Sequence, residues 1–144
     1  MTDVSDRGAD PLDPSEYRML AAFRYTLRRF LSFSETAAAE VGLAAQQYQA
    51  LLVVRGWAEE GPVTISDLAR ELYIKHNSAV GLVDRLVQQR LLTRAISSAD
   101  RRKVELTLTP RGRTILATLA ALHRQELLRL GPVFKRFFAD ISRQ

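Results

Sequence analysis

Two clusters in the middle of the chain carry the side chains best suited to contact another molecule. The first holds four consecutive hydrogen-bond donors, namely Lys75, His76, Asn77 and Ser78. The second lies in the polar stretch SSADRRK and consists of Arg101, Arg102 and Lys103 beside Asp100. Donors at the start of a helix can read base edges in a DNA groove, and guanidinium groups can lie along phosphates. Asp100 could hold one arginine in position by a charge-assisted hydrogen bond.

The charge of the chain is concentrated around the second cluster. The 144 residues have a net charge of +5, and 18 of the 21 basic side chains are arginines. Residues 1–14 are acidic, whereas the segment 85–113 has eight basic residues against only Asp100 and Glu105. An arginine-rich surplus of this kind favours a polyanionic partner, although a merely solvated surface has the same composition.

Composition also excludes several classes of protein. The absence of cysteine excludes disulfides, thiolate metal sites and thiol-based redox sensing. The two histidines, His76 and His123, are too far apart in the sequence to suggest a zinc site, so we expect no metal and no cofactor. Phosphate-loop, HExxH and GxSxG motifs are missing, which argues against an enzyme. No apolar run approaches 18 residues and the head resembles no secretory signal, so we expect a cytoplasmic protein.

Capping residues and apolar spacing predict four helices in the first 90 residues. Asp13, Pro14 and Glu16 begin a long helix that runs to about Glu40. A second helix is expected from about residue 44 to 60, where Gly61-Pro62 ends it. The segment Thr64-Ile-Ser-Asp67 caps a short helix over 65–72, and another helix follows over 77–89. The residues of the second helix expected in the core are Tyr48, Leu51, Leu52, Val54 and Trp57.

The pattern changes to strict alternation after Arg90. Apolar residues alternate with polar ones over 92–96 and again over 104–108, which predicts a β-hairpin whose tip is SSADRRK. A single-residue strand is expected near Val63. Thr109-Pro110 then begins a long helix to about Leu130; Gly131-Pro132 is expected to break it, leaving a last helix over 132–141. The final segment carries Phe134, Phe137, Phe138 and Ile141, which a short helix cannot bury by itself.

The order of these elements predicts a fold. The helices over 65–72 and 77–89 have helix-turn-helix spacing, and Ala69 is small where the two must cross closely. A basic hairpin follows immediately. The combination is that of a winged helix-turn-helix, so we expect a mainly α protein with a small β-hairpin, flanked by dimerisation helices. Gly81 lies inside the second helix at a cost of about 0.5–1 kcal/mol relative to alanine, which favours close approach of a backbone or base edge.

Residues 45–113 resemble the multiple-antibiotic-resistance regulator (MarR) family of bacterial transcription factors. The matching segments are AQQYQALLVV, GPVTISDLARELYI, SAVGLVDRLVQQRLLTR and DRRKVELTLTPRGR. The last contains the wing signature of the family as Asp100, Arg102, Leu108 and Thr109. The resemblance implies a homodimer that binds a pseudo-palindromic operator in double-stranded DNA, usually as a repressor of nearby genes. It also implies that a small aromatic or phenolic ligand releases the DNA.

The chain departs from the family pattern at two places. Family members often carry Thr-Arg before the LVDRL motif, where this chain has Val80-Gly81. The glycine that usually precedes the wing is Arg90 here, so Arg90 must adopt a helix C-terminal conformation without the freedom of glycine, or supply an extra cation. The first departure moves the expected base contacts towards the four donors at residues 75–78.

These inferences divide the chain and assign its residues. We expect a disordered head over 1–12, an N-terminal dimerisation helix over 13–43, the winged helix-turn-helix over 44–109 and C-terminal dimerisation helices over 110–144. The expected DNA-binding residues are Thr64, Ser66, Lys75, His76, Asn77, Ser78, Gly81, Arg94, Asp100, Arg101, Arg102 and Lys103. The candidate ligand-binding residues are Tyr25, Tyr48, Arg55 and Trp57, although Arg55 could equally pair with Glu59 four residues on.

One alternative function stays open from the sequence. A winged helix does not guarantee DNA binding, so the chain could be a dimeric adaptor or antirepressor that acts through other proteins. The basic surplus around the hairpin favours DNA.

Overall fold

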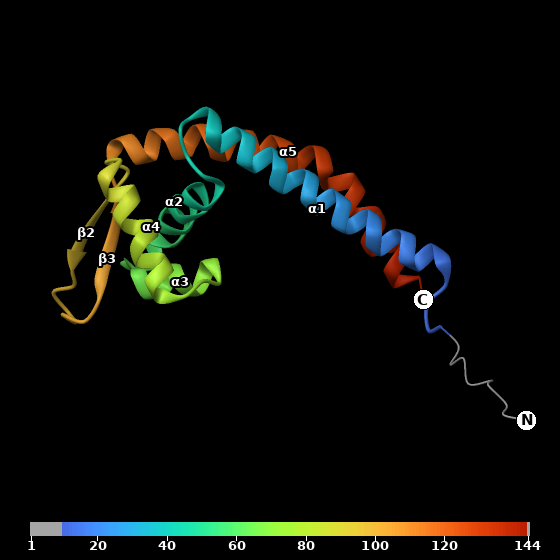
Figure 1. The fold of residues 1–144 in the computed structure, drawn as a ribbon, viewed down its shortest axis with the longest axis horizontal. Helices are drawn as coiled ribbons and strands as arrows, with labels where there is room; N and C mark the ends of the chain where they lie inside the picture. The colour runs from blue at the N-terminus through green and yellow to red at the C-terminus, as the bar shows by residue number, and fades with distance from the viewer. Residues whose placement is uncertain (1–9, 144) are drawn as a thin grey trace, which may run out of the picture.

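A computed structural model of the chain describes residues 10–143 (Figure 1). The elements in chain order are α1 (Pro14–Glu40), α2 (Ala45–Trp57), a short 3-10 helix (Ala58–Glu60), β1 (Val63–Thr64), α3 (Ile65–Leu72), α4 (His76–Gln88), β2 (Leu92–Ile96), β3 (Val104–Leu108) and α5 (Pro110–Ser142). The fold class expected from the sequence is confirmed. Among the described residues, no helix is both long and apolar enough to cross a membrane.

Local capping explains where the helices begin. Asp13 caps α1 by accepting hydrogen bonds from the backbone of Ser15 and Glu16, and the Glu16 carboxylate accepts one from the backbone of Asp13. Thr64 caps α3 in the same reciprocal way with Asp67, and the hydroxyl of Thr109 accepts from Gly112 to begin α5. Each cap satisfies backbone N–H groups that lack an intrahelical partner. All three helix starts were predicted correctly from these residues.

A lobe comprising residues 45–108 is built on a three-stranded antiparallel sheet. The strand order is β1-β3-β2. Leu106 of the central strand β3 lies opposite Val63 of β1 on one side and opposite Arg94 of β2 on the other. Helices α2, α3 and α4 pack with this sheet around a core whose fully buried side chains include Leu51, Leu68, Leu82, Leu86, Leu91 and Leu92. Ala69 of α3 is buried. The strand near Val63 has two residues rather than one.

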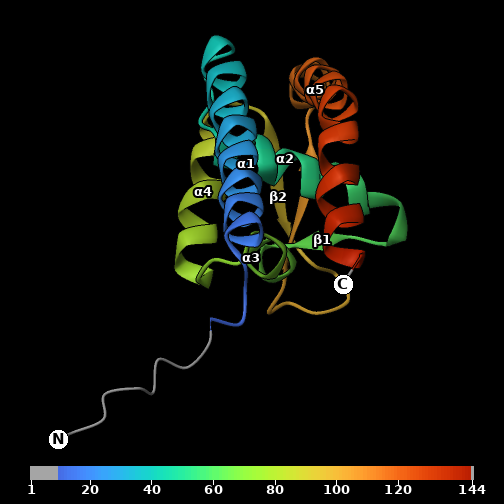
Figure 2. The same ribbon diagram turned by 90° about the vertical axis from the view of Figure 1, so that its right-hand side faces the viewer.

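A helical arm, comprising α1 and residues 120–142 of α5, projects from the lobe. Figures 1 and 2 show the two helices side by side, with the C-terminus of α5 near the start of α1. Phe23 of α1 packs edge-to-face against Phe134 and Phe137 of α5, with ring centroids 5.8 and 5.6 Å apart. The arm therefore extends well beyond the core of the lobe.

The expected break at Gly131-Pro132 is wrong, because α5 continues through Pro132 to Ser142. A proline inside a helix costs about 3 kcal/mol, since the carbonyl four residues earlier loses its donor. Here that carbonyl belongs to Leu128. Packing of Phe134 and Phe137 on Phe23 of α1 stabilises the helix beyond this position. The two last helices of the prediction are thus one curved helix (Figure 1).

Two side chains of α2 that were expected in the core are on the surface instead. Tyr48, Leu51 and Val54 are buried, but Leu52 and Trp57 are 44% and 45% exposed. The helix has a single buried face in this chain, and Leu52 and Trp57 lie off that face. Of the head expected to be disordered, residues 1–9 lie outside the described residues. At Asp10 the carboxylate accepts a hydrogen bond of 2.5 Å from the Tyr17 hydroxyl.

Candidate nucleic-acid interface

The start of α4 presents the first cluster of donors to solvent. Lys75 is the residue that precedes α4 with extended backbone, and His76, Asn77 and Ser78 form the first turn. All four are exposed. Helix α4 has no side-chain cap, so its first backbone N–H groups are left for solvent or a ligand. The structure therefore places these donors together at the accessible end of the second helix of the helix-turn-helix.

We call the whole β2–β3 hairpin, residues 92–108, the wing. Internal hydrogen bonds order its tip. The Ser97 hydroxyl accepts from the backbone N–H groups of Ala99 and Asp100 at 3.2 Å. The Lys103 backbone donates to the carbonyl of Asp100 at 3.0 Å and accepts from Ser97 at 2.9 Å. These bonds give the connection between β2 and β3 a defined shape, so the basic side chains project from a fixed turn.

Asp100 holds one arginine of the tip, as the sequence predicted, and that arginine is Arg102. The Arg102 guanidinium donates through Nε and Nη2 to the two carboxylate oxygens of Asp100, at 3.1 and 3.2 Å. These bonds, together with one from the Arg102 backbone, hold the pKa of Asp100 below its usual value. The Arg102 side chain is nevertheless 91% exposed. Its guanidinium is thus oriented while staying accessible to a partner.

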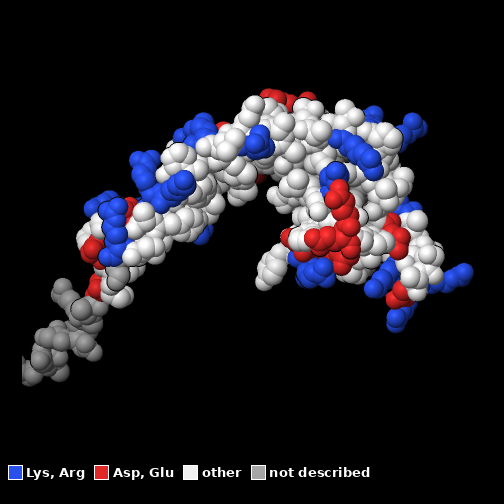
Figure 3. Space-filling view, turned by 180° about the vertical axis from the view of Figure 1, so that it is seen from behind, with Lys and Arg blue, Asp and Glu red and all other residues white. Residues whose placement is uncertain are grey.

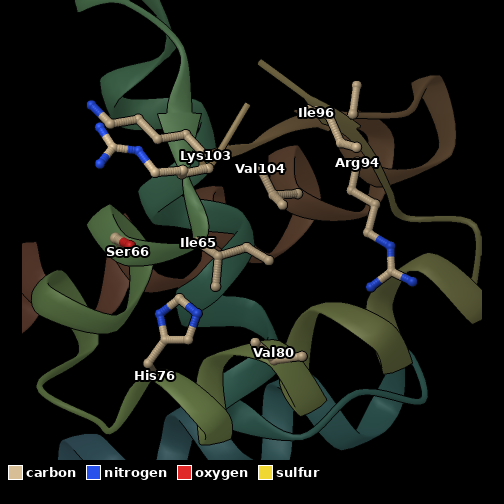
Figure 4. Close-up of a pocket in the computed structure, with 10 residues that line it drawn as sticks. Ile65, Ser66, His76, Val80, Arg94, Ile96, Lys103 and Val104 are labelled. Carbon is tan, nitrogen blue, oxygen red and sulfur yellow. The ribbon is translucent and has the colours of Figure 1, made fainter. Parts of the chain in front are cut away.

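The wing and the start of α4 face one another across a cavity of about 360 Å³ (Figure 4). Apolar, cationic and imidazole side chains line it. Lining residues include Ile65, Val80, Ile96, Val104, His76, Arg94, Arg102 and Lys103. Ser66 also lines this cavity, from the first turn of α3. Both predicted clusters therefore lie at the same end of the lobe.

Two expected contact residues are occupied by internal interactions. The Thr64 hydroxyl accepts from the backbone of Asp67 at 3.1 Å, so it acts as a helix cap. The Asp67 carboxylate accepts from the Thr64 backbone at 3.0 Å, and this bond is the main cause of a lowered pKa of Asp67. Arg94 on β2 forms an ion pair with Asp84 on α4. Sequence reasoning missed this pair because it joins residues on different elements.

The sequence departs from the family pattern at Arg90 and at Gly81, and the structure describes the backbone at both positions. Arg90 has a φ of 59°, the left-handed conformation expected of it at the end of α4. Apart from its chain neighbours and the backbone of its own helix, the one described atom within 4 Å of the position that a Cβ on Gly81 would take is Nη2 of Arg85, at 4.0 Å. Protein packing therefore does not require a glycine at position 81.

Tyr73 ends α3 in the left-handed conformation, with a φ of 56°, and its side chain is 97% exposed. No sequence signal indicated that this residue ends the helix.

The four candidate ligand residues are not brought together. Tyr48 is buried, and its ring stacks on His123 with centroids 4.2 Å apart; burial raises the pKa of this phenol. Arg55 pairs with Glu59 at 3.8 Å and lines a different cavity from Trp57. Tyr25 is exposed on the arm beneath the guanidinium of Arg29.

Charge is distributed unevenly over the lobe. Figure 3 shows basic side chains at the wing end and acidic ones gathered on the face of the lobe seen in that view. Glu60, Asp67 and Glu71 line one cavity with Trp57. The basic end is therefore the part of the lobe with the electrostatics suited to a polyanion.

Comparison with known proteins agrees with this geometry. Residues 41–103 match the model of the MarR family. A 71-residue segment is 35% identical to the uncharacterised HTH-type transcriptional regulator YsmB of Bacillus subtilis (strain 168); it covers 49% of this chain and about half, 48%, of that relative.

Solved structures extend the likeness to the flanking helices. A MepR–DNA complex from S. aureus superposes with a TM-score of 0.71 at 16% identity, covering 85% of this chain and 92% of that one. AbsC of Streptomyces coelicolor, a MarR family transcriptional regulator, gives 0.71 at 21% identity, with 90% and 82% coverage. MarR from E. coli without ligand gives 0.71 at 18%, with 92% and 98% coverage. Residues 41–103 thus resemble the MarR family, and the chain shares the winged helix-turn-helix fold of these solved structures.

Proposed function

We propose that the protein is a homodimeric, sequence-specific regulator of transcription that binds double-stranded DNA. The observation that carries the proposal is the common cavity that His76, at the start of α4, shares with Arg102 and Lys103 on the wing. The width of a DNA major groove admits a helix such as α4, and an exposed cationic hairpin fits an adjacent backbone or minor groove. The MepR fold, which this chain shares, has been solved with DNA.

In this proposal Asn77 reads bases and the wing supplies backbone contacts. Asn77 lies in the first turn of α4, whereas the residue in the capping position is Lys75. The amide of Asn77 is therefore available for a bidentate contact with adenine. Arg101, Arg102 and Lys103 are exposed and carry charge that neutralises phosphates. The remaining residues of the interface are Ser66, His76, Ser78 and Gly81.

The arm is the proposed dimerisation surface. Large apolar side chains remain exposed along both of its helices, including Leu20, Tyr25, Leu31, Leu127, Leu128, Phe138 and Ile141. An apolar surface along an elongated helical pair is unusual for a monomer, and a second copy with the same surface would cover it. Two lobes held in this way would meet two half-sites of a pseudo-palindromic operator.

Repression of nearby genes follows if the operator overlaps a promoter, and we propose that a small aromatic ligand releases the DNA. Footprinting of the dimer on the DNA that flanks its own gene tests the operator. We expect one protected, pseudo-palindromic segment at physiological salt. Uniform protection, or none, would contradict sequence-specific binding.

The salt dependence of retention on a DNA column distinguishes a DNA-binding regulator from an adaptor that acts through other proteins. Neutralising about six to ten phosphates would make the affinity fall about 10³–10⁵-fold between 50 and 200 mM salt. A winged helix that works only through protein partners would elute from a DNA column at low salt without such dependence.

A further inference from the structure

The base of the wing packs with helix α4, since Leu92 is buried in the same core as Leu82 and Leu86, and further out an ion pair joins the two elements. Arg94 lies in the middle of β2 and Asp84 lies in the third turn of α4, and Nη1 of Arg94 donates to Oδ1 of Asp84. Further along the wing, Ile96 and Val104 face the start of α4 across the cavity of about 360 Å³. Ile96 is 69% exposed, so its side chain is not packed on the helix, whereas its strand partner Val104 is partly buried against the core.

Arg94 is directed towards α4 and away from the basic tip. Figure 4 shows its guanidinium beside the α4 ribbon, on the opposite side of the cavity from Lys103. The side chains of Arg94 and Asp84 are 47% and 45% exposed, so water screens the pair. Exposed ion pairs of this kind contribute little to global stability. Because the pair joins the wing to α4, its main effect is on the relative position of these two elements.

We propose that Arg94 is a positioning residue: through Asp84 it sets the distance and angle between the wing and α4, and it does not contact DNA. This inference rests on the proposed function, and it replaces the DNA contact expected of Arg94 from the sequence. With the pair intact, α4 and the wing tip are held at the separation that suits neighbouring grooves. Without it, we expect the part of the wing beyond Arg94 to vary more in its distance from α4, while the base of the wing stays held by the sheet.

The two possible roles of Arg94, phosphate contact and positioning residue, predict opposite effects of Asp84→Ala on DNA binding. If Arg94 bound phosphate, Asp84 would compete for it, and Asp84→Ala would strengthen DNA binding. If Arg94 positions the wing, Asp84→Ala weakens operator binding about as much as Arg94→Ala does. The slope of log affinity against log salt then stays unchanged in both variants, because the same number of phosphates is neutralised.

A charge exchange provides the sharpest test. The double variant Asp84→Arg with Arg94→Asp restores the pair in reverse, so we expect operator affinity to return to within about threefold of the unmodified protein, far above either single reversal. Arg101→Ala is the matched control, because no ion pair of Arg101 is found among residues 10–143. It should lower the salt slope by about one for each phosphate that is no longer neutralised. A lowered slope in Arg94→Ala, or a double variant no better than the singles, overturns the proposal.

A measurement without DNA separates failure of this inference from failure of the proposed function. Because the chain has no cysteine, Ser98→Cys on the wing and Glu71→Cys on α3 provide two unique sites for spin labels. The distribution of distances between the labels should broaden in Arg94→Ala and Asp84→Ala and become narrow again in the charge exchange. It should not change in Arg101→Ala. An equally narrow distribution in every variant would show that the pair does not position the wing, whatever the protein binds.

Discussion

The hydroxyl oxygen of Ser34 on α1 lies 2.8 Å from Nε2 of His123 on α5, and both side chains are buried. The other ring nitrogen of His123, Nδ1, lies 2.7 Å from the carbonyl oxygen of Leu119. A carbonyl oxygen can only accept, so Nδ1 carries a proton, and in the neutral imidazole Nε2 accepts from Ser34. Tyr48 of α2 stacks on the same ring. The imidazole therefore joins α1, α2 and α5 where the arm meets the lobe.

Ser34→Ala should destabilise the protein by about 1–3 kcal/mol, because it leaves a buried ring nitrogen without a partner. Thr26→Ala is the matched control: Thr26 is on the same helix, and its exposed hydroxyl bonds only to the carbonyl of Ala22. We expect that change to have little effect. Chemical denaturation of both variants measures the difference, and equal stabilities would argue against a structural role for the buried bond.

The wing and the recognition helix should respond differently to substitution. Arg102→Ala should weaken binding to operator and unrelated DNA alike and lower the salt slope, since backbone contacts carry little sequence information. Asn77→Ala should cost about 1–3 kcal/mol on the operator and much less on unrelated DNA, because an amide–adenine pair is lost. Binding titrations on both DNAs at several salt concentrations measure these effects.

Thermal unfolding provides the control for Asn77. A residue that caps a helix contributes about 1 kcal/mol to stability, but the capping position of α4 belongs to Lys75. The melting temperature of Asn77→Ala should therefore stay close to that of the unmodified protein. A lower melting temperature with equal losses on both DNAs would mean that Asn77 supports the helix rather than reading bases.

The sequence predicted those features of the fold that depend on neighbouring residues. Asp13, Thr64 and Pro110 mark helix starts because capping is decided within one turn, and alternation over 92–96 and 104–108 specifies a strand. The Asp100–Arg102 contact was predictable for the same reason, since the two residues are in one turn. Pro132 was misinterpreted because its effect depends on α1, which lies at the other end of the chain.

Features of the site that depend on tertiary contact were not predictable. The Asp84–Arg94 pair joins a helix to a strand, and the exposure of Trp57 depends on how α2 sits on the sheet. The residues at the start of α4 and in the wing were nevertheless located correctly on their elements. What the sequence could not provide was their mutual arrangement around a cavity.

The arm should hold the dimer together through its exposed leucines. Leu128→Glu places a charge on a residue that is 64% exposed in the protomer, so the fold of each chain should survive while the dimer dissociates. Ile96→Glu is the matched control, since Ile96 is similarly exposed but lies on the wing. Sedimentation equilibrium should show a weakened dimer for Leu128→Glu alone. A stable dimer in both variants would place the dimer interface elsewhere.

The cap of α3 should make a pH-dependent contribution to stability. The hydrogen bond from the Thr64 backbone holds the pKa of Asp67 below its unfolded value of 3.8. Folding therefore favours the ionised carboxylate, so its contribution is present above pH 3.8 and is lost as the pH falls through the lower folded value. Asp67→Asn should lower the melting temperature at neutral pH, and its difference from the unmodified protein should shrink in acid. A difference that does not vary with pH would contradict this account.

Gly112 joins the start of α5 to the base of the wing, and it should tolerate no side chain. A Cβ at this position would lie 2.2 Å from the carbonyl oxygen of Leu91, a backbone atom that also accepts from Thr109. Leu91 cannot move without disturbing the turn after α4, so Gly112→Ala should cost about 1–3 kcal/mol or more by overpacking.

Gly131 is the control, because it lies in the same helix and, among residues 10–143, no atom outside its chain neighbours and the backbone of its own helix lies within 4 Å of the position that its Cβ would take. Gly131→Ala should stabilise the protein by about 0.5–1 kcal/mol, the usual preference for alanine inside a helix. Thermal unfolding of the two variants should therefore shift in opposite directions. If Gly112→Ala were as stable as Gly131→Ala, the contact between α5 and Leu91 would not constrain the junction.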